Sequence, residues 1–158
     1  MTPSIKHRVL GAILSVAVIA AAGAAAAPTP DLAQVVKDRQ ALMRQQFRDL
    51  KTIKGFLDGT GDQAAAVAAA DELNRTVPKV PDMFPPGTDM AAPKGKFRPK
   101  PAVWTDKDKF AAAQKTVVDQ IGVLAAAVKA GDKPKITAAF NDVDGCDACH
   151  KDFREKIQ

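Results

Sequence analysis

Helical periodicity, interrupted by one proline-rich stretch, most constrains the fold of this chain. Apolar residues recur every three or four positions in four segments, at about 31–56, 62–77, 105–130 and from 133 or 134 nearly to the end. That spacing predicts amphipathic helices. No run alternates apolar and polar residues in the way that predicts a strand. The pattern therefore predicts an all-α protein, a four-helix bundle with a long proline-rich connection between its second and third helices.

The connection between the second and third predicted helices is rich in proline. Seven prolines lie between Pro78 and Pro101, and each removes a backbone donor and fixes φ. We therefore expect a long irregular connection that is neither helix nor strand. A connection of roughly 28 residues is unusual in a compact domain and indicates a crossover or a binding role. Thr29 and Thr105 are the expected caps of the first and third helices.

The first 26 residues are predicted to be a secretory signal peptide. A short basic segment, Lys6 to Arg8, precedes an unbroken run of apolar and small residues, and an A-x-A cleavage site can be placed after Ala26. The alternative is an uncleaved membrane anchor, because the run is nearly long enough to span a bilayer. With cleavage, residues 27–158 form one domain in the periplasm, without a membrane contact.

The two cysteines carry the sharpest chemical signal. Cys146 and Cys149 are three positions apart, and His150 follows directly. C-x-x-C-H is the attachment motif of c-type haem, since two thiols on one helical face can reach two vinyl groups while the histidine ligates iron. A thiol–disulfide centre would lie in a βαβ setting, and a zinc site needs four ligands. The sequence therefore predicts one covalent haem c with His150 as an axial iron ligand.

A sixth iron ligand would have to come from upstream, because only eight residues follow His150. The other histidine, His7, leaves with the predicted signal peptide, so methionine sulfur is the remaining candidate: Met43, Met83 or Met90. Met43 lies on the apolar face of the first predicted helix, where a bundle would point it inward. It could ligate iron, cover an open iron face, or fill the core.

Arg39 lies on the same apolar stripe, one turn before Met43. A buried lone charge is costly, so this arginine needs a partner. A haem propionate would supply one through a charge-assisted contact, and the neighbouring Gln40 is a second candidate for that haem edge. The alternative is that Arg39 extends its guanidinium to solvent.

The sequence does not indicate a nucleic-acid-binding protein or an enzyme. The net charge is +5, with one Trp, no Tyr and no dense basic stripe with interleaved aromatic residues, so nucleic-acid binding is not indicated. No general base beside a substrate pocket can be identified, so we do not expect an enzyme. A haem-free helical interaction module or thiol module is the alternative of a different class.

Four motifs, in their order and spacing, resemble the cytochrome c′ family, also called class II c-type cytochromes. They are V-x-x-R-Q-x-x-M at 36–43, F-P-P-G-T at 84–88, A-V-W-T-D at 102–106 and C-D-A-C-H-K-D-F-R at 146–154. The resemblance covers essentially all of residues 27–158. The segment K-G-K-F-R-P-K, Lys94 to Lys100, departs from the shorter family loop.

The resemblance implies that the haem domain is an antiparallel four-helix bundle, often a homodimer, with haem attached to the last helix inside the bundle. It implies that Arg39 and Gln40 line the haem, that Met43 covers the distal face and that Arg154 lies beside the proximal His150. Typical members bind nitric oxide or carbon monoxide at five-coordinate iron. Low-spin relatives instead use a methionine near the position of Met43 as sixth ligand. Either kind would exchange electrons with a redox partner protein.

Overall fold

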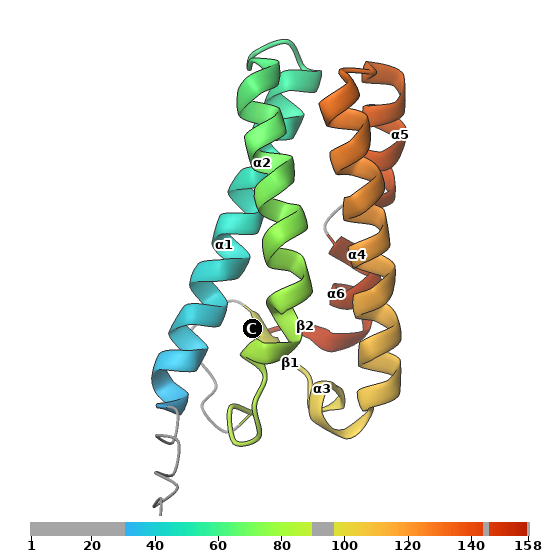
Figure 1. The fold of residues 1–158 in the computed structure, drawn as a ribbon. Helices are drawn as coiled ribbons and strands as arrows, with labels where there is room; N and C mark the ends of the chain where they lie inside the picture. Colours follow the sequence, from blue (N-terminus) through green and yellow to red (C-terminus); the bar gives the residue numbers. More distant parts are fainter. Residues whose placement is uncertain (1–30, 90–96, 144–145, 158) are drawn as a thin grey trace, which may run out of the picture.

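The computed structural model describes residues 31–89, 97–143 and 146–157. The predicted signal peptide, residues 1–26, and Met90 lie outside the described residues. Within the described part, α1 (Leu32–Leu57) and α2 (Gln63–Thr76) form one helical hairpin, and α4 (Lys107–Ala130) and α5 (Lys133–Val143) form another. Figure 1 shows the two hairpins packed side by side as a bundle, which confirms the predicted fold class.

A core of aliphatic side chains holds the two hairpins together. α2 is rich in alanine, and its buried Ala66, Ala69 and Ala70 allow neighbouring helices to approach closely. Complete burial of one large aliphatic side chain stabilises a fold by about 1.5–3 kcal/mol. The largest fully buried aliphatic residues are Ile53, Leu73, Ile121, Leu124, Val128, Ile136 and Val143.

Aspartates, not threonines, cap the first and third long helices. The Asp31 carboxylate accepts hydrogen bonds from the amides of Ala33 and Gln34 at the start of α1. Asp106 accepts from the amide of Lys109 at the start of α4, at 3.3 Å. The expected cap at Thr105 is therefore wrong, since that residue ends the short helix α3 (Ala102–Thr105), and Thr29 lies outside the described residues.

The proline-rich connection contains more regular structure than expected. It begins with the 3₁₀ helix η1 (Val77–Met83), which carries a proline in its first turn, a position that proline tolerates well. Further on, β1 (Phe97–Pro99) pairs antiparallel with β2 (Arg154–Lys156). The expectation of neither helix nor strand is therefore wrong. Strands of three residues are too short to show an alternating pattern in the sequence.

The last predicted helix is divided in two. α5 ends at Val143, and α6 spans Asp147–Phe153. Cys146 lies directly before α6 and has φ 55°, in the left-handed region. A residue in that conformation interrupts a right-handed helix. The expectation of one continuous helix is therefore wrong.

No helix in the described ranges combines the length and hydropathy needed to cross a bilayer.

Candidate functional site

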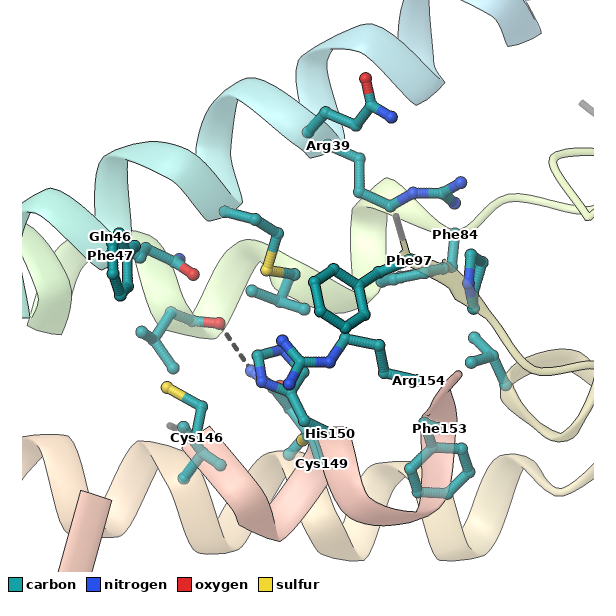
Figure 2. A pocket seen from close by; sticks show the side chains of 18 of the residues that line it. Arg39, Gln46, Phe47, Phe84, Phe97, Cys146, Cys149, His150, Phe153 and Arg154 are labelled. Atoms are coloured by element: carbon teal, nitrogen blue, oxygen red, sulfur yellow. Dashed lines mark hydrogen bonds between the residues drawn. The ribbon is translucent and has the colours of Figure 1, made fainter. Parts of the chain in front are cut away.

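A cavity of about 620 Å³ lies between α1, η1, β1, α4 and α6. Ligand cavities in proteins are typically about 300–1,000 Å³ and mostly apolar, so this one has the size and character of a cofactor site. Figure 2 shows the labelled lining side chains reaching into it from several elements. Its apolar wall includes Leu50, Val77, Val80, Val103, Phe110 and Val117.

All six candidate residues from the sequence line this one cavity. They are Arg39, Gln40 and Met43 on α1, and Cys146, Cys149 and His150 at α6. In Figure 2 the labelled α6 residues lie on the wall opposite the α1 helix that carries Arg39. Met83 does not line the cavity; it lies in a shallow depression between α1 and α2. Among the methionines of the described residues, Met43 is therefore the one that lines the same cavity as His150.

Cys146 and Cys149 are free thiols, and both are partly buried. Burial raises the pKa of Cys149 to about 11, with the neighbouring Cys146 as a smaller cause. Burial also raises the pKa of Cys146, while the positive charge of Arg154 opposes the rise. Both thiols are therefore protonated at neutral pH in the haem-free chain, and no disulfide joins them.

Arg39 does not reach solvent, because only 4% of its surface is exposed. Its Nη1 donates to the Met83 carbonyl at 3.2 Å and to Thr88 Oγ1 at 3.4 Å. The guanidinium lies 4.5 Å from the centroid of the Phe84 ring, and desolvation lowers the pKa of Arg39. Its Nη2 is buried without a hydrogen-bond partner among the described residues. A buried charged donor without a partner is expensive, so an anionic ligand group would fit here.

Four aromatic rings form a chain of edge-to-face contacts, and three of them, Phe84, Phe110 and Phe153, line the cavity. Phe84 lies 5.8 Å from Trp104 and 5.5 Å from Phe110, and Phe110 lies 5.1 Å from Phe153, as distances between ring centroids. Trp104 Nε1 donates to the carbonyls of Phe84 and Pro85 at 3.1 and 3.2 Å. The cluster joins the proline-rich connection to α4 and α6. Phe84 and Trp104 belong to the motifs at 84–88 and 102–106, but the sequence alone did not predict a role for either ring.

Two buried glutamines at the cavity wall were also missed. Gln46 Nε2 donates to Thr76 Oγ1 at 3.4 Å, and Gln114 Nε2 donates to the Val77 carbonyl at 2.6 Å. Gln46 is seven residues after Arg39, so it continues the same helical stripe. The position of a polar residue, Gln46, on an otherwise apolar stripe was the sequence signal that could have identified it as a buried site residue. The two amides connect α1 and α4 to the end of α2 and the start of η1.

Comparison with known proteins agrees with this geometry. The model of the family described as cytochrome c′ matches residues 34–154. Cytochrome c′ of Cereibacter sphaeroides is 37% identical over 156 residues, which cover 95% of this chain and 99% of that protein.

Two solved structures show the same fold. A nitric oxide complex of a variant cytochrome c′ from Alcaligenes xylosoxidans is 30% identical and has a TM-score of 0.69, covering 82% of this chain and all of that one. A cytochrome c′ described as having ligand-controlled dimer dissociation has a TM-score of 0.75 at 24% identity, with the same coverage. The chain therefore belongs to the cytochrome c′ family, the haem-binding class II c-type cytochromes.

Proposed function

We propose that this protein is a periplasmic monohaem cytochrome c′ that binds a diatomic gas at five-coordinate iron and exchanges single electrons with a redox partner. The observation that carries the proposal is the cavity itself. Its α6 wall bears two thiols and a histidine, while the described α1 residues opposite include Met43 but no histidine. This arrangement would supply one strong iron ligand, His150, and leave the other side of the cavity to small molecules.

Cys146 and Cys149 would hold the haem covalently. Each thiol would add across one vinyl group, so that an S–H bond and a C=C π bond are exchanged for a C–S and a C–H bond. No oxidant is needed. When bound, the haem supplies an iron atom that binds gases and changes its charge by one electron. His150, directly after Cys149, would offer its imidazole nitrogen to that iron.

Arg39 would hold a propionate of the haem. Its unpartnered Nη2 is buried at the cavity, and a charge-assisted hydrogen bond to a carboxylate would satisfy it. The other nitrogen, Nη1, is already fixed by the Met83 carbonyl and Thr88, so the guanidinium is held in place before the ligand arrives. Gln40, the next residue on α1 and part of the same lining, is a second contact for that haem edge.

Met43 is assigned a steric role on the side of the cavity opposite His150. Its flexible thioether would limit the space above the iron without bonding to it, and the apolar wall would exclude charged ligands. The relative from Alcaligenes xylosoxidans was solved as a nitric oxide complex, which supports nitric oxide as the gas. The function needs no general base and no substrate turnover, so we do not propose an enzyme.

A second candidate is a low-spin electron carrier with His150 and Met43 as axial ligands. The observation that favours it is that Met43 lines the same cavity as His150. Met43 would then supply its sulfur to the iron, and methionine ligation would raise the reduction potential.

Export and assembly complete the proposal. Residues 1–26 would direct the chain to the periplasm and be cleaved, which leaves 27–158 as the haem domain. A homodimer is proposed because a related cytochrome c′ is described by its ligand-controlled dimer dissociation. We propose no nucleic-acid partner, because the sequence lacks a dense basic stripe with interleaved aromatic residues.

The optical and EPR spectra of the ferric protein distinguish the two candidates, measured again after reduction and addition of nitric oxide. A high-spin ferric signal and rapid gas binding are expected, and Met43→Ala should accelerate gas binding without changing the spin state. Met83→Ala is the matched control, because Met83 lies outside the cavity. A low-spin spectrum whose sulfur–iron charge-transfer band disappears in Met43→Ala would replace the first candidate by the second.

A further inference from the structure

The β1–β2 ribbon ties the long connection to the segment that follows His150. The strands pair antiparallel, with Pro99 opposite Arg154. Directly after β1, the Lys100 amide donates to the Phe153 carbonyl at 2.9 Å. The ribbon therefore holds a strand of the connection against the C-terminal end of α6, the helix that carries the candidate iron ligand.

Arg154 contacts both His150 and the β1 strand of the ribbon. Its backbone N–H donates to the His150 carbonyl, which closes the last turn of α6. Its guanidinium lies 4.6 Å from the centroid of the Phe97 ring on β1. Phe97, Arg154 and His150 all line the same cavity, and Figure 2 shows their labelled side chains together in it.

α6 depends on such contacts for its position. It has seven residues, and helices this short are not stable in water without tertiary packing. At the N-terminal end the chain turns through the left-handed Cys146. At the other end the buried Phe153 packs against Phe110, and the ribbon follows immediately. The orientation of His150 therefore depends on how firmly the ribbon fixes Arg154.

We propose that Phe97 is a positioning residue for His150: by stacking on Arg154, it fixes the end of α6 and sets how readily His150 leaves an iron atom bound in the cavity. The inference rests on the proposed function, in which His150 ligates haem iron. The competing role for Phe97, which is 47% exposed, is to cover apolar surface. Leucine would fill that role equally well, whereas a cation–π contact needs an aromatic face.

The test compares haem-loaded wild type with Phe97→Leu, Phe97→Tyr and Arg98→Gln. Leucine keeps apolar bulk without the aromatic face, and tyrosine keeps the face. Arg98→Gln removes the ion pair with Glu155 across the ribbon. That pair is solvent-exposed and contributes little to stability, so the ribbon backbone pairing and the stack stay intact. Two quantities are measured. One is the hydrogen-exchange rate of the Arg154 amide in the protein as purified, whether or not haem is bound. The other is the rate at which excess nitric oxide displaces His150 from iron, followed by EPR.

A surface cation–π contact corresponds to a change of about twofold to fivefold in an equilibrium or rate. Phe97→Leu should accelerate both exchange and His150 displacement by this factor, while Phe97→Tyr and Arg98→Gln keep the wild-type rates. Equal rates in the leucine and tyrosine variants would overturn the proposal, as would faster exchange without faster displacement. If wild type itself lacked haem or His150 ligation, the proposed function would fail, and the amide exchange would still report whether the stack fixes Arg154.

Discussion

Replacement of Arg39 by methionine should destabilise the haem-loaded protein. Methionine matches the length of the arginine stem but has no donor and no charge. The change removes the hydrogen bond to the Met83 carbonyl at 3.2 Å, the stack on Phe84 at 4.5 Å and the proposed propionate contact.

The magnitude follows from these lost contacts. A hydrogen bond from a charged group contributes about 1.5–3 kcal/mol, and a desolvated cation–π contact contributes about 2 kcal/mol. The hydrogen bond to Thr88, at 3.4 Å, is longer and adds less than the bond to the Met83 carbonyl. Burial of the methionine side chain and removal of the unpartnered Nη2 offset part of the loss. We therefore expect the free energy of unfolding to fall by about 2–4 kcal/mol.

Denaturant unfolding of haem-loaded wild type and Arg39→Met, followed by absorbance of the haem, measures this difference. Arg48→Met is the matched control on the same helix. Arg48 is exposed and donates to the side chain of Gln45 three residues earlier on the same helix, so its replacement should change stability by no more than about 0.5 kcal/mol. Equal stability of Arg39→Met and wild type would refute the assignment of Arg39 as a buried anchor for an anionic group.

Two further predictions concern the core and the thiols. Leu73→Ala leaves a cavity at a fully buried position and should lower the free energy of unfolding in denaturant by about 2–5 kcal/mol. A decrease below about 1 kcal/mol would contradict the packing described. In the haem-free chain, stability should fall as pH rises from about 9 towards about 11, because burial raises the pKa of Cys149 from 9.0 to about 11 and the unfolded state loses its proton first. Urea titrations across this pH range should show the fall in wild type and a smaller one in Cys149→Ser.

The helices of the bundle could be predicted closely because their signals are local. Apolar spacing gave α1, α2 and α4 to within a few residues of their observed ends. Periodicity cannot choose between neighbouring cap candidates, since Thr105 and Asp106 both have suitable side chains and only the folded backbone decides between them. The division of the last helix was missed because cysteine gives no local signal for the left-handed conformation of Cys146.

The kind of candidate site could be predicted from the sequence, but only some of the residues that line it. Cys146, Cys149 and His150 form a contiguous motif, and Arg39 and Met43 stand out on an apolar stripe. Phe97 could not be found in this way, because its place at the cavity depends on pairing between strands more than fifty residues apart. A three-residue strand has no periodicity to detect, and long-range pairing is set by the whole fold.

The mass of the purified protein under denaturing conditions, followed by peptide mapping, tests the central claim most directly. We expect the mass of residues 27–158 plus one haem, with the haem on the peptide that contains Cys146 and Cys149. A chain of that length without haem, or with haem that dissociates on denaturation, would contradict covalent attachment at these cysteines.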